Sequence, residues 1–357
     1  MIEHSMYNQR IVFITEDLSF PIDEGMKKFN YAFVDFIVNH FSDFKLYVSK
    51  ADNQLVTSKN VSRRSFKSLK FYGEIRNFAP QLIVYSPLSS GTLASFIRLY
   101  LLKLTAKQDR AILINLQRRK HGFLGKVLIK LIRPPQVVVF SRRDFNYFKL
   151  LKTDPVFCKT GVDLDRFKPV SAEMKAKLRS KYGINLNDRV FLHIGHLNKG
   201  RNIESMKALV ENHNYVLIVG STSTNVEVTL RDDLIKSGID IRDTYIENIE
   251  ELYQLSDVYI FPVKNDHSAI EFPLSVLEAM ACNLPVITTP FGSLPDHFKQ
   301  TGCFVYLNDF RDLKIHSDKI LKTPCTNRGI ASQFSWNSVL KDLVTNLEAN
   351  DYLSDRY

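Results

Sequence analysis

Short apolar runs alternate with helical patterns along the whole chain. In the first half, the helical pattern over Met26–Phe41 has apolar residues at the spacing of one helix face. The runs that we interpret as buried strands are Ile11–Thr15, Phe44–Val48, Gln81–Tyr85, Ala111–Asn115 and Gln136–Phe140, then Arg189–Ile194, Tyr215–Val219, Val258–Phe261 and Pro285–Thr288. Continuous apolar strands separated by helices are typical of parallel, doubly wound α/β sheets. The pattern therefore predicts such a sheet in each half.

A break in this rhythm separates the two halves. The segment 160–169, Thr-Gly-Val-Asp-Leu-Asp-Arg-Phe-Lys-Pro, contains Gly161 and Pro169 and few helix formers, as a connecting segment does. We predict a first domain over residues 1–165, a second over residues 170–333, and a C-terminal helix within residues 334–357.

The segment 269–292 carries the clearest candidate chemistry. Leu274, Leu277 and Ala281 are spaced as on one helix face, and the strand Pro285–Thr288 follows. Pro273 suits the first helical position, where its missing N–H is not needed. Glu278 falls in the middle of this apolar helix, where a buried carboxylate is costly without a partner. A carboxylate beside the end of a strand is placed to meet a ligand of an α/β sheet, although it could also cap a neighbouring backbone.

Composition restricts the classes of protein. The 357 residues, 45% of them hydrophobic, suffice for two globular domains. The four cysteines are scattered without metal-ligand spacing, which favours a reduced cytosolic chain over a disulfide scaffold. Because the N-terminal residues lack a long apolar core, we expect no signal peptide. No uncharged apolar run approaches the roughly 20 residues that span a bilayer.

Charge is distributed unevenly between the halves. Residues 1–160 hold 26 Lys or Arg and 12 Asp or Glu, a net charge of +14, and the remainder carries −4. A basic half suggests an anionic surface, an anionic acceptor or nucleic acid. Two segments there, Leu93–Leu104 and Gly122–Arg133, mix apolar and basic residues, and such helices either cover a sheet or lie in a membrane interface. The cations that we expect to face lipid are Arg118, Arg119, Lys120, Lys126, Lys130 and Arg133.

The segment 269–292 resembles the signature of the retaining nucleotide-sugar glycosyltransferases of the GT-B fold, the group 1 family. That signature reads Glu-Gly-Phe-Gly, four residues, a second Glu, then Ala-Met-Ala-x-Gly-x-Pro-Val. The second Glu, which binds ribose hydroxyls in the family, matches Glu278. The first Glu aligns with Ile270, and Glu271 is the nearest carboxylate. Phe272 matches, and Pro273 and Asn283 replace glycines.

Two further segments resemble parts of the same family. Residues 160–169 are similar to its interdomain segment, and Phe334-Ser-Trp336 is similar to the start of its last helix, which returns to the first domain. The resemblance implies a GT-B fold, in which two Rossmann-like domains face each other across a cleft. It also implies that the first domain takes the acceptor and the second binds the donor.

The resemblance assigns donor roles to residues of the second half. The turn Gly195–Asn202 corresponds to the family's phosphate-binding turn, and His196 stands where the family has an Arg. Lys199 and Arg201 are then the cations for the diphosphate, unless they are merely solvated. Gly220 ends a strand at a turn of the kind that lines the donor pocket. Glu271 is the candidate contact to the donor sugar, and the donor-binding set is completed by Glu278, Gly195, Phe272, Pro273 and Leu274.

Acceptor and phosphate roles fall in the first half. Gly25 lies in the loop that corresponds to the family's phosphate-covering loop and permits close backbone approach. Asp23 and Glu24 either cap the following helix or receive an acceptor hydroxyl. Many relatives have a His where this chain has Gln117, and His121 is the candidate substitute, although a loop His is often only solvated.

The implied reaction is transfer of a sugar from a nucleotide-diphosphate sugar to an acceptor hydroxyl, with retention of configuration and without a metal or other cofactor. We expect a glycan or lipid-linked acceptor and a cytoplasmic chain that binds peripherally to the membrane. Two alternatives stay open: a catalytically silent GT-B subunit that binds sugar or a partner, and a glycosyltransferase that modifies nucleic acid. The basic half lacks a nucleic-acid recognition motif, which disfavours the last alternative.

Overall fold

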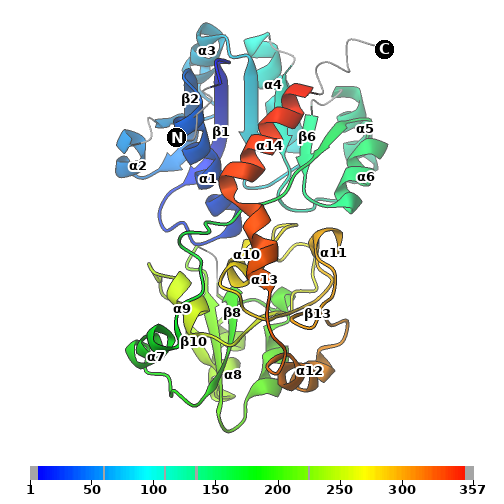
Figure 1. Ribbon diagram of the computed structural model, residues 1–357. Coiled ribbons are helices and arrows are strands. Elements are labelled where there is room, and N and C mark those ends of the chain that lie inside the picture. The colour runs from blue at the N-terminus through cyan, green and yellow to red at the C-terminus, as the bar shows by residue number, and fades with distance from the viewer. Residues whose placement is uncertain (1–6, 59–60, 108–109, 133–135, 224–225, 350–357) are drawn as a thin grey trace. The chain divides into compact units, whose positions relative to one another are not determined.

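Two parallel sheets organise the chain (Figure 1). The computed structural model describes residues 7–58, 61–107, 110–132, 136–223 and 226–349. Their contacts divide into two units. The first lies within Met1–Ile22, Met26–Lys159 and Val339–Tyr357, and the second comprises Asp23–Gly25 and Thr160–Ser338. The division falls close to the predicted connecting segment, and its later boundary lies inside the last helix, α14 (Trp336–Ala349).

The first unit is built on a seven-stranded sheet in the order β3-β2-β1-β4-β5-β6-β7. Its strands are β1 (Ile11–Leu18), β2 (Phe44–Ala51), β3 (Val61–Arg63), β4 (Leu82–Ser86), β5 (Ala111–Ile114), β6 (Gln136–Val139) and β7 (Asp154–Phe157). Every neighbouring pair is parallel. The five predicted strands are present, whereas β3 and β7 were not predicted because they are short and partly polar.

Helices connect the strands of the first unit. They are α1 (Gly25–His40), α2 (Asn53–Ser58), α3 (Leu69–Phe78), α4 (Leu93–Ala106), α5 (Phe123–Ile132) and α6 (Arg142–Leu150). The helical pattern over Met26–Phe41 and the two amphipathic segments correspond to α1, α4 and α5. Thr92 caps α4 by accepting a hydrogen bond from the Ser95 N–H, as a preferred N-cap residue does. Arg133 lies outside the described residues.

The second unit is built on a six-stranded sheet in the order β10-β9-β8-β11-β12-β13, again parallel throughout. Its strands are β8 (Arg189–Gly195), β9 (Asn214–Gly220), β10 (Asp240–Arg242), β11 (Val258–Phe261), β12 (Val286–Thr288) and β13 (Phe304–Tyr306). The four predicted strands occupy its centre, and the unpredicted β10 and β13 are its three-residue edges. The sheets of both units thus have the predicted doubly wound α/β character.

The second unit's helices are short. They are α7 (Ala172–Lys181), α8 (Val228–Lys236), α9 (Glu250–Leu255), α10 (Leu274–Ala281), α11 (Leu294–His297), α12 (Leu313–Ile320) and α13 (Asn327–Ala331), with 3₁₀ turns η1 (Lys199–Arg201), η2 (Ile203–Leu209), η3 (Phe310–Asp312) and η4 (Ser332–Phe334). Pro273 precedes α10 as its N-cap and does not occupy its first turn. The prediction for Pro273 was wrong by one residue, because its ψ of 117° is extended.

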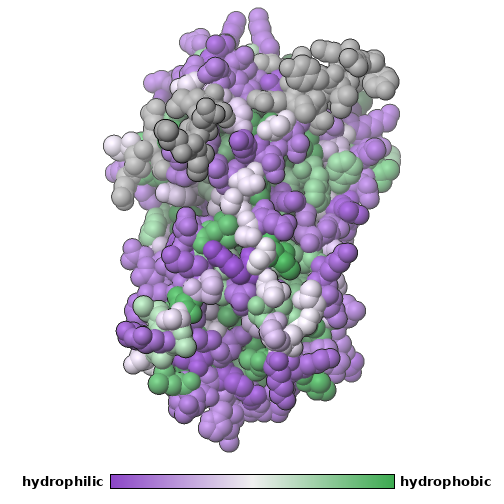
Figure 2. Space-filling view, in the orientation of Figure 1, coloured by the Kyte–Doolittle hydropathy of each residue, from purple (hydrophilic) through white to green (hydrophobic). Residues whose placement is uncertain are grey.

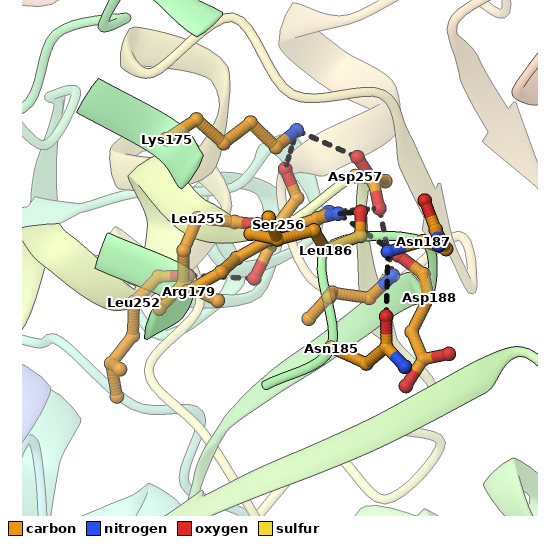
Figure 3. A network of polar contacts seen from close by, with 11 residues as sticks. Lys175, Arg179, Asn185, Leu186, Asn187, Asp188, Leu252, Leu255, Ser256 and Asp257 are labelled. Atoms are coloured by element: carbon orange, nitrogen blue, oxygen red, sulfur yellow. Dashed lines mark hydrogen bonds and ion pairs between the residues drawn. The ribbon is translucent and has the colours of Figure 1, made fainter. Parts of the chain in front are cut away.

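A partly buried ion pair fixes the end of the second sheet at which β8 and β11 begin (Figure 3). Arg179 donates to Asp257 at 2.6 Å and to the backbone carbonyls of Leu255, Leu186 and Asp188. Asp257 also accepts from Lys175 at 2.6 Å and from the Val190 N–H at 2.7 Å. A buried charge is tolerated when it is paired and hydrogen-bonded in this way. The network ties α7 to the sheet and has a structural role.

Candidate functional site

At the opposite end of β8, the guanidinium of Arg201 lies close to Gly195. Gly195 is the last residue of β8, and the turn that follows brings Arg201 back toward it. A β-carbon at Gly195 would lie 2.2 Å from Nη1 of Arg201 and 3.1 Å from Nε2 of His193. Only a glycine therefore permits this approach. The turn holds the cation at the carboxyl end of the central strand, where ligands of doubly wound sheets bind.

Arg201 is a cation that is buried at the end of β8. Its residue is 6% exposed, and its Nε has no hydrogen-bond partner. Among the residues that the structure describes, no Asp or Glu forms an ion pair with Arg201. Burial lowers its pKa to about 10. Arg179 is buried to the same degree yet is fully hydrogen-bonded. Within the described part of the chain, the positive charge of Arg201 at the end of β8 is therefore uncompensated, which is the requirement of an anion site.

Two histidines beside Arg201 are kept neutral. His193 on β8 is fully buried, and its Nδ1 lies 2.8 Å from the carbonyl oxygen of Ile260. Burial, and secondly the charge of Arg201, lower the pKa of His193 to about 3 and that of His196 to about 4. Since Nδ1 must carry the proton to donate to a carbonyl, Nε2 of His193 is an acceptor, and it has no hydrogen-bond partner.

Lys199 differs from Arg201 in its surroundings. Its side chain is exposed, while its backbone N–H donates to Glu227 at 3.2 Å. Nothing in the sequence distinguishes the two cations of this turn. In the structure Arg201 is buried and Lys199 is solvated. Lys199 is available as a mobile point charge, whereas Arg201 is fixed in place.

The neighbouring strand ends in register with β8. Gly220 on β9 pairs with Gly195, and a β-carbon on Gly220 would lie 2.9 Å from Cδ1 of Leu197. The turn after Gly220 binds the carboxylate of Asp23, which accepts hydrogen bonds from the Thr222 N–H and hydroxyl at 2.7 and 2.8 Å. Asp23 is also hydrogen-bonded to Ser223. Although burial opposes it, these hydrogen bonds lower the pKa of Asp23. Residues 224 and 225, which follow in this turn, lie outside the described residues.

Glu278 is a buried carboxylate on α10. It is 4% exposed, and Tyr253 of α9 donates to its Oε2 at 2.7 Å. Burial, and then the charge of Glu278, raise the pKa of Tyr253 well above its usual value. A buried carboxylate at this position was expected to need a partner, and the structure identifies that partner as Tyr253.

Tyr259 of β11 links Glu278 to the end of β8. Its buried ring lies 6.4 Å from that of His193 and 5.6 Å from that of Tyr253, between centroids. Burial raises the pKa of Tyr259, while hydrogen bonding by Ser275 and the charge of Arg201 oppose the rise. Arg201 and Glu278 thus act on the same phenol from two elements. We take Gly195, His193, Arg201, Tyr259, Tyr253 and Glu278 together as the candidate site.

The residues before α10 are packed into the second unit. Glu271 is fully buried, and its carbonyl accepts from the N–H and hydroxyl of Ser293 at 2.8 and 3.0 Å. A β-carbon on Gly292, which has a φ of 54°, would lie 2.1 Å from that carbonyl oxygen. Phe272 stacks on His297 with ring centroids 4.7 Å apart. Leu274, the first residue of α10, is 5% exposed. The structure therefore gives each of these predicted residues a packing contact.

The remaining predicted residues lie in two places. Gly25 starts α1, and a β-carbon there would lie 3.0 Å from Cδ1 of Ile270; Glu24 beside it is partly buried. His121 belongs to the first unit, where Nδ1 lies 2.8 Å from the Tyr147 hydroxyl and Nε2 lies 2.7 Å from the Gly91 carbonyl oxygen. Burial lowers the pKa of His121. Both of its ring nitrogens are hydrogen-bonded within the first unit.

Comparison with known proteins relates this chain to glycosyltransferases. Residues 188–322 match the family described as Glycosyl transferases group 1. An uncharacterised glycosyltransferase of Methanocaldococcus jannaschii is 24% identical over 195 residues, which cover 49% of this chain and 48% of that protein. A D-inositol 3-phosphate glycosyltransferase of Mycobacteroides abscessus is 27% identical over 202 residues, 52% of this chain and 44% of that protein. The chain thus matches about half the length of these curated relatives.

Solved structures show the same fold over nearly the whole chain. HepE from Anabaena, crystallised with UDP and glucose, superposes with a TM-score of 0.73 at 14% identity, covering 96% of this chain and all of HepE. The chain has the GT-B fold, and residues 188–322, which contain the candidate site, are similar to the glycosyl transferases group 1 family.

Proposed function

We propose that this chain transfers a sugar from a nucleotide-diphosphate sugar to an acceptor hydroxyl, and that the diphosphate binds at Arg201. The observation that carries the proposal is the buried guanidinium over Gly195, which has no ion pair among the described residues. A ligand with two or more negative charges supplies the missing countercharge. A nucleoside diphosphate fits this requirement, and HepE, which has the same fold, was crystallised with UDP and glucose.

The chemistry of transfer favours a fixed cation. The bond between the anomeric carbon and the β-phosphate oxygen breaks, a bond from the acceptor oxygen to that carbon forms, and the acceptor proton passes to the departing phosphate. Negative charge grows on the diphosphate as the sugar departs. A guanidinium held in a water-poor position stabilises that charge without reorganising, and it binds phosphate oxygens bidentately. We infer that Arg201 acts on this charge and that exposed Lys199 adds a second, mobile cation.

Glu278 supports the same placement of the nucleotide. The charges of Glu278 and Arg201 both act on the phenol of Tyr259, one from α10 and the other from the turn after β8. This pair of groups suits a ligand that has a hydroxyl-bearing end and an anionic end. We infer that Glu278 accepts from ribose hydroxyls, that configuration is retained, that no metal takes part, and that the acceptor is a glycan or a lipid-linked sugar reached from the cytoplasm.

A donor panel tests the proposal. The protein is incubated with UDP-, GDP- and ADP-sugars, and the released nucleoside diphosphate is measured together with nucleotide affinity by calorimetry. Arg201→Gln should abolish release and weaken nucleoside diphosphate binding at least tenfold, while Arg311→Gln, which changes an exposed arginine of the same unit, should do neither.

Two other results would be informative. Nucleotide binding without turnover for any donor and acceptor tried would instead favour the silent-subunit alternative. Unchanged nucleotide affinity in Arg201→Gln would contradict the proposed site. For an active donor, the anomeric configuration of the product, read by NMR, tests retention.

A further inference from the structure

Two helices of the first unit that contact each other, α4 and α5, expose an unusual amount of apolar surface. On α5, Phe123 is 80% exposed, Leu124 74% and Leu131 72%, and the structure buries only Ile129 of this helix. The other exposed apolar side chains of the pair are Ile97, Leu101, Leu104, Val127 and Leu128. We call these eight exposed residues the α4–α5 surface.

Helix α5 does not have the exposure pattern of a helix that covers a sheet. A helix that covers a sheet buries an apolar stripe and exposes polar residues. Helix α5 has seven large apolar residues in ten positions, and most of them face away from the core. Apolar side chains gather over α5 in Figure 2. Isolated exposed apolar residues are ordinary, but a contiguous group of this kind marks an interaction surface.

The charges around the α4–α5 surface select the partner. Residues 87–143 contain twelve Lys and Arg against a single acidic residue. Neither α4 nor α5 contains an Asp or Glu, and Lys126 and Lys130 are exposed on α5. A second copy of this surface would bring these lysines toward each other, and like charges disfavour such pairing. An anionic bilayer instead offers an apolar interior beneath a negative surface.

We propose that the α4–α5 surface binds the interface of an anionic membrane, with Phe123, Leu124 and Leu131 entering the acyl boundary and Lys120, Lys126 and Lys130 meeting the headgroups. Among the described residues, no helix is long and apolar enough to cross a membrane. Helix α5 has ten residues, far fewer than the roughly 20 that span a bilayer. The surface belongs to the first unit, whereas the candidate donor site belongs to the second. The inference is therefore independent of the proposed function.

Vesicle co-sedimentation tests the proposal with matched variants. The full chain is mixed with vesicles of phosphatidylcholine alone, or with one third phosphatidylglycerol. The double variant Leu124→Asp/Leu131→Asp removes apolar side chains from α5. The control Val228→Asp/Ile315→Asp changes two side chains of the second unit, 63% and 68% exposed, by the same chemistry. A further variant, Lys126→Glu/Lys130→Glu, reverses the charge.

Wild type and control should bind the anionic vesicles and bind the neutral ones at least tenfold more weakly. Both α5 variants should lose at least tenfold in partition while keeping the circular dichroism of the wild type. Phe123→Trp should show blue-shifted emission with anionic vesicles, because its ring enters the apolar boundary. Equal binding of wild type and the leucine variant, equal binding to both vesicles, or no binding would overturn the proposal. So would a wild-type dimer in light scattering that the leucine variant abolishes without any vesicle binding.

Discussion

The hydroxyl of Tyr253 donates a 2.7 Å hydrogen bond to Oε2 of Glu278, and both side chains are buried. They come from α9 and α10, so the bond fixes the carboxylate relative to the sheet. A phenol that donates to a carboxylate stabilises the ionised carboxylate and disfavours loss of its own proton, which agrees with the raised pKa of Tyr253. Tyr253 is therefore a positioning residue for Glu278.

Glu278→Gln should separate folding from nucleotide binding. The amide oxygen of Gln still accepts from Tyr253, so we expect the free energy of unfolding to change by less than about 1 kcal/mol. Loss of the charge should weaken nucleoside diphosphate binding by about 1.5–3 kcal/mol, the range for a hydrogen bond to a charged group. Calorimetry measures the affinity, and Glu204→Gln on η2 is the exposed control. An unchanged affinity would place the ribose elsewhere.

Removing divalent metal should leave turnover unchanged. The proposed countercharge to the diphosphate is Arg201, a fixed side chain that does not need a metal ion. Release of nucleoside diphosphate from the best donor is measured with and without excess EDTA, followed by addition of Mg²⁺ or Mn²⁺. Loss of turnover in EDTA that either ion restores would contradict the metal-independent proposal.

The apolar pattern was sufficient to predict the central strands of both sheets but not the short strands at their edges. Strands such as β8 and β11 are apolar because helices cover both faces of the sheet, and the resulting apolar runs can be recognised in the sequence. The three-residue strands β3, β10 and β13 are too short to establish a period. Glu278 was predicted from its place in an apolar helix and again from the resemblance to a family, which also supplied the turn after β8. Both occupy the candidate site.

The electrostatic character of the site could not be predicted from the sequence. Lys199 and Arg201 are two residues apart in one turn, and only the three-dimensional fold makes one exposed and the other buried. His193 and Tyr259 were predicted only as parts of strands, and Tyr253 was not singled out from the sequence. Their roles depend on distances between β8 and the segment that holds α9, β11 and α10, which lies far from β8 in the chain. His121 is the opposite case: the sequence made it a candidate site residue, but in the structure its two ring nitrogens are hydrogen-bonded to Tyr147 and Gly91.

Acid should destabilise the protein partly through His193. Its pKa of about 3 in the folded chain lies below the ordinary histidine value of 6.5, so between these values the unfolded state binds a proton that the folded state does not. Stability from this group is complete above pH 6.5 and is lost as the pH falls toward 3. His193→Asn keeps a donor for the Ile260 carbonyl and removes the titration.

The variant should therefore lose less stability on acidification. Chemical denaturation at neutral pH and near pH 5 should show a loss that is smaller than that of wild type by about 2 kcal/mol. His213→Asn, at an exposed histidine of the same unit, should match wild type. Identical acid dependence of wild type and His193→Asn would mean that His193 is already protonated or exposed in the folded chain.

Two buried arginines of the second unit should respond in opposite ways to the same substitution. Arg179→Met leaves Asp257 with one ion-pair partner fewer and frees three backbone carbonyls, so the free energy of unfolding should fall by about 3–5 kcal/mol. Arg201→Met removes a desolvated charge that has no ion pair among the described residues, so the free energy of unfolding should rise by about 1–3 kcal/mol.

The same Arg201→Met variant should lose nucleoside diphosphate binding at least tenfold, because a site that binds an anion carries its uncompensated charge at the expense of stability. Denaturant unfolding gives the stabilities and calorimetry the affinities. Wild type with saturating UDP provides the internal check, since a ligand that neutralises Arg201 should stabilise wild type and leave Arg201→Met unaffected. If Arg201→Met instead destabilises the chain as Arg179→Met does, Arg201 is a structural residue and its charge is not reserved for a ligand.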